Sequence, residues 1–207
     1  PWLFAPTFTQ SLFYLALLVY LKALRTSKMR WHVLTGVMLG IVFLGHTASA
    51  VILGCIMLGS ALTEAILSRK GLSPLTLRGI ALRFAIVMGA AFIVSLPYSY
   101  SILFHYKLHV INTKPSRWVW DYLSLEKLPV FTRNTLSWPT LLAVMGFLGL
   151  LTRPWKNPEK RIIFFWLATA GTFFVYSYAC QWLEIRGTIL PQLCPNYHFL
   201  LYLSAVK

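Results

Sequence analysis

The sequence predicts an all-α fold: a polytopic bundle of about six membrane-spanning helices with the start of a seventh, in a single domain over residues 1–207. Three observations predict it. Hydrophobic residues make up 57% of the chain. Charged residues make up only 12%, about half the share that is usual in soluble domains. Apolar runs as long as a membrane-spanning helix recur along the chain, and most of them have no polar face.

The apolar runs give the spanning helices in order. A helix needs about 20 residues to cross the bilayer core. The runs are Thr7–Leu24, Trp31–Leu67, Leu82–Leu103, Trp138–Thr152 and Ile162–Leu183, with a helix start near Tyr197. Residues 97–137 are predicted to be a long loop on the outer face. Because both ends of the sequence are abrupt, we expect an internal portion of a longer membrane protein.

The positive charge is large and lies in short blocks between the apolar runs. The formal net charge is +14. A basic stripe with interleaved aromatic residues would indicate nucleic-acid binding. The sequence has no such stripe, so we expect no nucleic-acid partner. Lys and Arg beside membrane helices mark the cytoplasmic side, here of a bacterial inner (plasma) membrane. The blocks are Arg25, Lys28 and Arg30; Arg69, Lys70, Arg78 and Arg83; and Arg153, Lys156, Lys160 and Arg161.

The run Trp31–Leu67 is predicted to fold back on itself as two helices. One unbroken helix would be about 55 Å long, whereas a bilayer core is about 30 Å thick. It would also place one of its two basic ends on the outer side. A turn at Gly45–Thr47 gives two crossings and keeps both ends inside. We expect Gly45 to permit the tight turn and Thr47 or Ser49 to cap the second helix.

Basic side chains on the predicted outer face are candidates for binding a lipid-linked phosphate. They are His46, Arg186 and His198. Cationic groups at a membrane surface suit a phosphate or diphosphate headgroup. His46 lies at the tip of the predicted turn, where it could also act as an acid or base near neutral pH. That it only caps the turn is an equal alternative.

Other ionisable residues give weaker signals. His105 and His109 have the helical spacing of a metal-binding pair, but no third ligand stands beside them. The sequence also lacks a phosphate-binding glycine loop and a dinucleotide-binding motif. We therefore expect neither a metal nor a cofactor. Glu64, an acid within an apolar run, is expected to form an interfacial ion pair with Arg69 or Lys70.

The segment "LALLVYLKALRTSKMRWHVLTGVMLGIVFLGHTASAVILG" resembles the multi-spanning membrane glycosyltransferases of the GT-C class. The class shares an apolar helix, a basic inner loop, a W-x-x-L-x-G-x-x-x-G pattern and a short outer turn after a leucine-rich run. Here the pattern begins at Trp31 and includes Gly36 and Gly40, and "LGHTA" around His46 is the turn. Small residues four apart, as Gly36 and Gly40 are, are also expected to support close helix packing. "CPNYHFLLYL" is similar to the segment that opens a late helix in the class, with His198 in the basic position.

The resemblance implies an activity and its partners. Enzymes of this class transfer a sugar from a polyprenyl-phosphate donor to an acceptor on the outer face of the membrane. The implied partners are membrane lipids and the lipid-linked donor. The class carries its catalytic aspartate in the first outer loop, and no such acidic loop is present here. The resemblance therefore places the catalytic acid upstream of Pro1, and neither Asp121 nor Glu126 is assigned that role.

Two other functions compete with the glycosyltransferase. The chain could be a non-catalytic transmembrane accessory subunit of a larger membrane complex, holding lipids or pigments, with His46 or His198 as a ligand to a macrocycle metal. A transporter would require paired acids or broken helices at the midplane, and the turn at His46 is predicted to lie at an outer face. The glycosyltransferase requires His46, Arg186 and His198 to converge on one cavity, because a leaving phosphate needs several donors. The accessory subunit does not.

Overall fold

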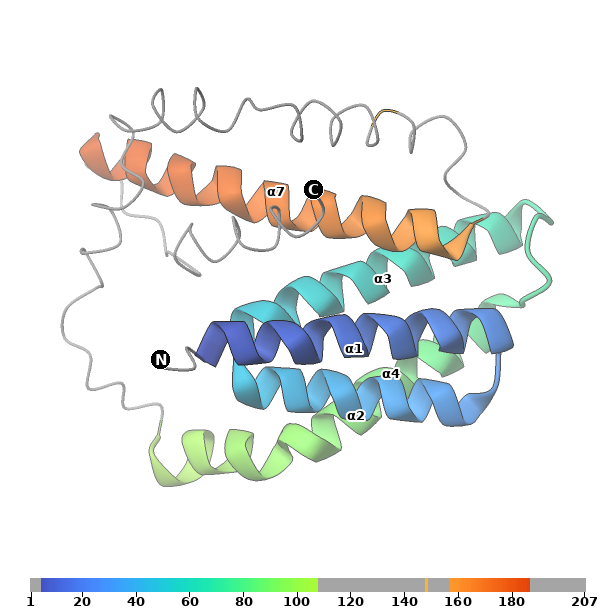
Figure 1. Ribbon diagram of the computed structural model, residues 1–207, viewed down its shortest axis with the longest axis horizontal. Helices are drawn as coiled ribbons and strands as arrows, with labels where there is room; N and C mark the ends of the chain where they lie inside the picture. The colour runs from blue at the N-terminus through green and yellow to red at the C-terminus, as the bar shows by residue number, and fades with distance from the viewer. Residues whose placement is uncertain (1–4, 108–147, 149–156, 187–207) are drawn as a thin grey trace. The chain divides into compact units, whose positions relative to one another are not determined.

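The computed structural model describes residues 5–107, 148 and 157–186, and these residues contain helices and no β-strand (Figure 1). In chain order the helices are α1 (Ala5–Thr26), α2 (Met29–Gly45), α3 (Thr47–Arg69), α4 (Leu77–Tyr100), the π-helical turn η1 (Ser101–His105) and α7 (Pro158–Ile185). The all-α prediction is confirmed. The number of spanning helices stays a prediction.

Two compact units contain the described residues. One is formed by residues 5–107 and 157–166, and the other includes residues 167–186. The first unit holds α1 to α4, η1 and the first turns of α7, and it is the larger of the two. The predicted single domain over residues 1–207 stays a prediction.

Two helical segments are long and apolar enough to cross a membrane. They are Thr47–Arg69, which is α3, and Leu77–His105, which is α4 continued by η1. Apolar side chains also cover outward-facing positions of the bundle: Leu18, Phe92 and Ile93 are each at least 60% exposed. Helices that are apolar both inside and outside fit a lipid environment better than water.

The predicted turn in the run Trp31–Leu67 is confirmed. Only His46 separates α2 from α3, and its backbone is extended, with φ −164° and ψ 113°. Its N–H donates to the Val42 carbonyl at 2.8 Å, which closes α2. Its own carbonyl accepts from the Ala50 N–H at 3.3 Å, which opens α3. One non-helical residue is enough to form the turn.

Both predicted supports of this turn are wrong in detail. Gly45 does not have a left-handed backbone, because Gly71 is the positive-φ glycine among the described residues. Gly45 instead permits close packing, since a Cβ there would lie 2.9 Å from the Thr9 hydroxyl oxygen of α1. The N-cap of α3 is His46 rather than Thr47 or Ser49, because the helix begins earlier than expected.

The fourth helix, continued by η1, includes the whole predicted run Leu82–Leu103, which overlaps the start of the predicted loop. Residues 97–105 are helical, so the loop predicted for residues 97–137 does not begin at Pro97. Proline removes one backbone donor but its fixed φ fits a helix. The chain continues into the π-turn, where the Tyr106 N–H donates to the Ser101 carbonyl at 2.9 Å. The remainder of the predicted loop, from residue 108, lies outside the described residues.

The closest helix packing in the bundle joins α2 to α4. A Cβ on Gly36 would lie 2.3 Å from the Val87 carbonyl oxygen and 2.7 Å from the Ala90 Cβ. A Cβ on Gly40 would lie 2.7 Å from the Val94 Cβ. Small residues four apart let two helix backbones approach this closely. The expectation that Gly36 and Gly40 support close helix packing is confirmed.

We predict that Gly36→Ala destabilises the bundle although alanine favours helix. The added methyl group meets the α4 backbone, which cannot move aside as a flexible side chain would, so a loss of about 1–3 kcal/mol in the free energy of unfolding is expected. The matched control is Gly89→Ala in α4, because a Cβ at Gly89 has nothing within 4 Å. Gly89→Ala should leave stability unchanged or raise it by up to about 1 kcal/mol. Denaturation of both variants in mild detergent measures the difference, and equal stabilities would contradict the packing described.

Candidate functional site

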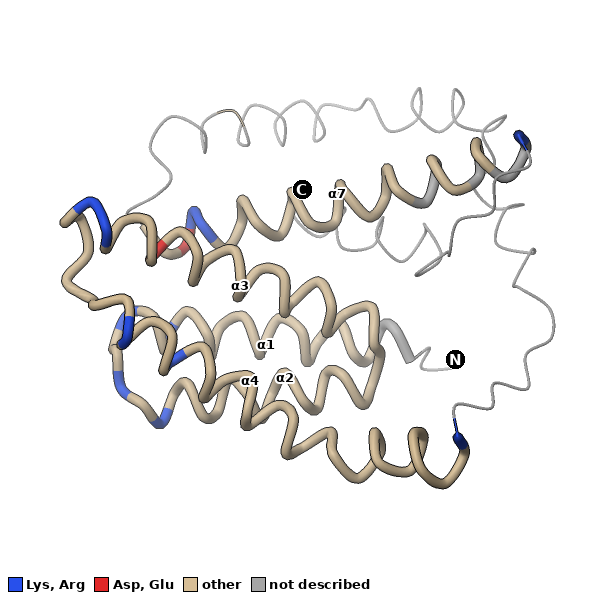
Figure 2. The backbone as a smooth tube through the Cα atoms, turned by 180° about the vertical axis from the view of Figure 1, so that it is seen from behind, with Lys and Arg blue, Asp and Glu red and all other residues tan. Residues whose placement is uncertain are grey.

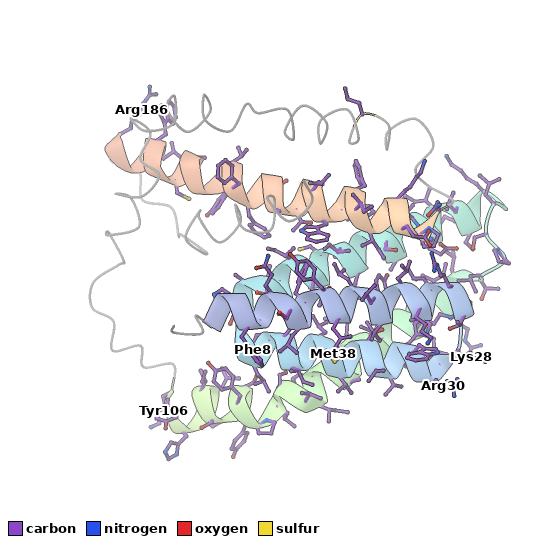
Figure 3. The ribbon with its side chains drawn as sticks, in the orientation of Figure 1. Phe8, Lys28, Arg30, Met38, Tyr106 and Arg186 are labelled. Carbon is purple, nitrogen blue, oxygen red and sulfur yellow. The ribbon has the colours of Figure 1, made fainter. Side chains whose placement is uncertain are left out.

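Most of the Lys and Arg positions of the first unit gather at one end of its helices (Figure 2). Lys28 and Arg30, where α1 gives way to α2, lie at this end, whereas Phe8 lies at the other (Figure 3). We call this the basic end, and its Lys and Arg are Lys22, Arg25, Lys28, Arg30, Arg69, Lys70, Arg78, Arg83, Lys160 and Arg161. Lys107, which follows η1 at the far end of α4, is the exception among the described residues of the first unit. The prediction that these blocks share one face is confirmed for the described residues. Arg153 and Lys156 lie outside them.

A largely buried ion pair lies at the basic end. Arg161 of α7 pairs with the Glu64 carboxylate of α3, with side chains 5% and 16% exposed. The Ser73 hydroxyl donates to the same carboxylate. The predicted pairing of Glu64 with Arg69 or Lys70 is wrong. Residues five and six positions on do not share a helix face with Glu64, whereas residues three and four on do.

Local sequence signals place Ser73 beside Glu64. The end of α3 is a Schellman motif: Gly71 has φ +68°, and the Leu72 N–H donates to the Leu67 carbonyl at 2.8 Å. The Ser73 hydroxyl also accepts from the Leu75 N–H at 3.1 Å, which holds the turn before α4. Thr76 then caps α4, its side chain accepting from the Gly79 N–H at 3.2 Å.

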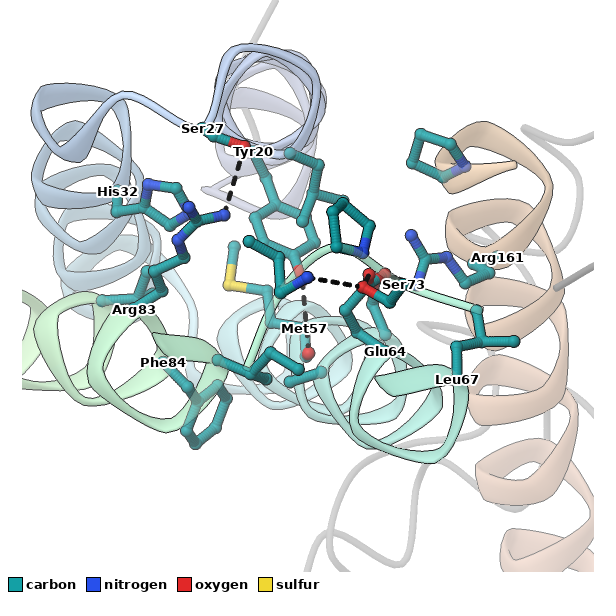
Figure 4. A pocket seen from close by; sticks show the side chains of 18 of the residues that line it. Tyr20, Ser27, His32, Met57, Glu64, Leu67, Ser73, Arg83, Phe84 and Arg161 are labelled. Carbon is teal, nitrogen blue, oxygen red and sulfur yellow. Dashed lines mark hydrogen bonds and ion pairs between the residues drawn. The ribbon is translucent and has the colours of Figure 1, made fainter. Parts of the chain in front are cut away.

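A cavity of about 270 Å³ opens beside the ion pair (Figure 4). Its lining comes from α1 to α4, the α1–α2 and α3–α4 connections and the start of α7. Its apolar part includes Tyr20, Leu24, Met57, Ile80, Phe84 and Val87, and its polar part includes Ser27, His32, Glu64, Ser73, Arg83 and Arg161.

Hydrogen bonds hold several of the polar groups around the cavity. The Tyr20 hydroxyl donates to the Met57 carbonyl at 3.3 Å. The guanidinium of Arg83 donates to the Ser27 hydroxyl oxygen at 3.2 Å, which joins α4 to the α1–α2 connection. The side chains of Glu64 and Arg83 also interact electrostatically. The cavity is therefore bordered by two arginines and one carboxylate.

The sequence did not predict this cavity. Arg83 counted only as one of the basic blocks, and Tyr20, His32 and Ser73 had no predicted role. One signal was available: Arg83 lies five residues beyond Arg78, further into an apolar helix, where a charge is costly and indicates a function.

The turn at His46 lies at the opposite end of the helices from the basic end. Burial lowers the pKa of His46 from its ordinary value of 6.5. The imidazole is therefore neutral at pH 7, and it offers a hydrogen bond rather than a positive charge. Because the folded chain holds this proton less tightly than the unfolded chain, its stability falls as the pH drops below 6.5. The role of His46 in binding phosphate stays a prediction.

The other predicted phosphate-binding residues are only partly placed. Arg186 follows the end of α7, in the second unit, and its guanidinium lies 3.6 Å from the centroid of the Trp182 ring. His198 lies outside the described residues, so convergence of the three side chains stays a prediction. His109 also lies outside them. Within the part of the chain that the structure describes, no group of three potential metal ligands is found.

Comparison of the chain with protein-family models, curated proteins and solved structures finds no match. The resemblance to the GT-C class therefore rests on the quoted sequence patterns.

We predict that the ion pair at the basic end stabilises the fold only as a pair. Arg161→Ala leaves the Glu64 carboxylate largely buried without its arginine and should cost about 3–5 kcal/mol in the free energy of unfolding. The double variant Glu64→Leu with Arg161→Leu should recover most of that loss, because it removes both charges together.

The matched control is the exposed pair of Arg25 and Glu159, with side chains 61% and 30% exposed. Arg25→Ala should change stability by about 1 kcal/mol or less, since water screens such pairs. Thermal denaturation in detergent measures all three variants. An Arg161→Ala loss no larger than that of Arg25→Ala would overturn the structural role assigned to the buried pair.

Proposed function

We propose that the chain is part of a polytopic membrane glycosyltransferase of the GT-C type, which moves a sugar from a polyprenyl-phosphate donor to an acceptor on the outer face. The observation that supports it is the order of elements in the first unit. An apolar helix, a basic connection, a second helix and a tight turn at His46 follow one another as the resemblance requires. The carboxylate that deprotonates the acceptor would lie outside this chain.

The proposal includes a bacterial plasma membrane with the basic end in the cytoplasm. Lys and Arg beside membrane helices favour the cytoplasmic side, and the first unit has most of its described basic residues at one end. The turn at His46 would then face outward, on the side where polyprenyl-phosphate sugars are used. The apolar surfaces of α3 and α4 would contact membrane lipids or neighbouring subunits.

The proposed task of the outer-face residues is to hold the phosphate that leaves the sugar. Stacking on Trp182 occupies the face of the Arg186 guanidinium but not its edge, where the N–H donors lie. That edge suits two phosphate oxygens at once. His46 would add a hydrogen bond, and His198 would complete the set. Donors aimed at one developing charge lower the barrier to transfer.

The orientation is tested by labelling single cysteines with a membrane-impermeant maleimide. In a background without Cys55, Cys180 and Cys194, Lys107→Cys should react in intact cells. Lys70→Cys should react only after the membrane is permeabilised. Labelling of Lys70→Cys in intact cells would contradict a cytoplasmic basic end.

The activity is tested with the full-length protein in proteoliposomes and a radiolabelled polyprenyl-phosphate sugar. We predict that Arg186→Ala lowers donor binding or turnover about tenfold or more, because a hydrogen bond to a charged group is worth about 1.5–3 kcal/mol. Arg186→Lys keeps the charge but loses the planar set of N–H donors that can bind two oxygens at once. It should therefore recover only part of the activity.

Arg78→Ala is the matched control for this assay. It removes an arginine from the basic end and should leave transfer unchanged. If the wild-type protein neither binds nor turns over any polyprenyl-phosphate sugar, the transferase proposal is wrong, and the accessory subunit is the leading alternative.

A further inference from the structure

The cavity at the basic end has an unbalanced charge. Arg161 is matched by Glu64, whereas Arg83 adds a second positive charge at the border of the same cavity. The two acids whose side chains are described, Glu64 and Glu159, each form an ion pair with another arginine. The cavity therefore has a formal charge of about plus one, and it attracts an anion with a single negative charge.

Arg83 is the side chain best placed to bind such an anion. Arg161 already donates from Nη1 to the Glu64 carboxylate, which balances its charge. Arg83 has five N–H donors, and the hydrogen bond that the structure gives it within the described residues goes to Ser27, a neutral partner on an exposed connection. An anionic oxygen is a stronger acceptor than this hydroxyl, since charge-assisted bonds are about twice as strong as neutral ones.

The rest of the cavity suits a molecule that is apolar beyond its charged group. Tyr20, Met57, Phe84 and Val87 give it an apolar lining that reaches in from the charged border. Its volume of about 270 Å³ fits a headgroup but not a whole lipid. Leu72, which also lines the cavity, is 50% exposed, so an acyl chain can continue outward over apolar surface.

We propose that this cavity binds the phosphodiester group of an anionic phospholipid from the leaflet at the basic end, with Arg83 as its principal ligand. A phosphodiester carries one negative charge, as the cavity requires. The lysines and arginines of the basic end favour a lipid with net negative charge over a zwitterionic one. The proposal rests on the membrane embedding proposed above but not on sugar transfer, because the cavity and the turn at His46 lie at opposite ends of the first unit.

The experiment measures lipid binding to the purified full-length protein in detergent, by native mass spectrometry and by the shift in Tm. The probes are dioleoylphosphatidylglycerol, dioleoylphosphatidylcholine and free glycerol 3-phosphate. Phosphatidylglycerol should bind at least about tenfold more tightly than phosphatidylcholine. Free glycerol 3-phosphate should not raise the Tm, because it lacks the acyl chain. Equal binding of the two lipids, or stabilisation by glycerol 3-phosphate alone, would overturn the proposal of a phospholipid site.

A matched pair of arginine variants separates the cavity from the general positive charge of the basic end. Arg83→Gln and Arg78→Gln remove the same charge from the same helix, but only Arg83 lines the cavity. Arg83→Gln should weaken phosphatidylglycerol binding about tenfold, and Arg78→Gln by less than about twofold. Equal losses would mean that the lipid responds only to overall charge.

Two further readouts keep the result decisive. Arg83→Lys retains a charge without the planar set of N–H donors. Its affinity for phosphatidylglycerol should fall between that of the wild type and that of Arg83→Gln. The Tm without added lipid shows whether each variant is folded. None of these measurements depends on sugar transfer, so the lipid site and the transferase proposal can fail separately.

Discussion

The close approach of α2 to α4 at Gly36 and Gly40 is the contact on which the rest of the first unit depends. It fixes where the first turns of α4 lie, because no side chain separates the two backbones. Val87 takes part twice: its carbonyl faces Gly36, and the residue lines the cavity at the basic end. A larger residue at Gly36 would move α4, and Arg83 one turn before Val87 would move with it. Packing and binding are therefore set by the same contact.

The arginines at the basic end differ in how deeply they are buried and in the charge of their partners. The pair of Arg25 and Glu159 is exposed and contributes little. The pair of Arg161 and Glu64 is largely buried, and it is tolerated only because each charge is matched and Ser73 satisfies the carboxylate further. Arg83 lies between these cases, partly buried and bonded to a neutral hydroxyl. A charge held in this way has the most to gain from an anionic ligand.

The sequence predicted the features that depend on short segments. The length of the run Trp31–Leu67 and its two basic ends were enough to predict the turn at His46, and the spacing of Gly36 and Gly40 predicted close packing. It did not predict that Glu64 pairs with Arg161, because these residues are 97 positions apart and meet only through tertiary packing. The cavity was missed for the same reason, since its lining comes from five helices and two connections. The predicted run Leu82–Leu103 and the predicted loop 97–137 overlapped at Pro97, and the structure has a helix there.

The two ends of the first unit differ in the charge that they would present to a phosphate, and this bears on the proposed reaction. At the basic end the positive charge is permanent, because arginine does not lose its proton. At the turn, burial keeps His46 neutral at pH 7. A phosphate bound beside His46 would raise the pKa of the imidazole, because a nearby negative charge favours the protonated form. His46 would then become cationic only when donor or leaving phosphate is present. Such a residue adds positive charge at the step that needs it, without the cost of a buried charge in the empty site.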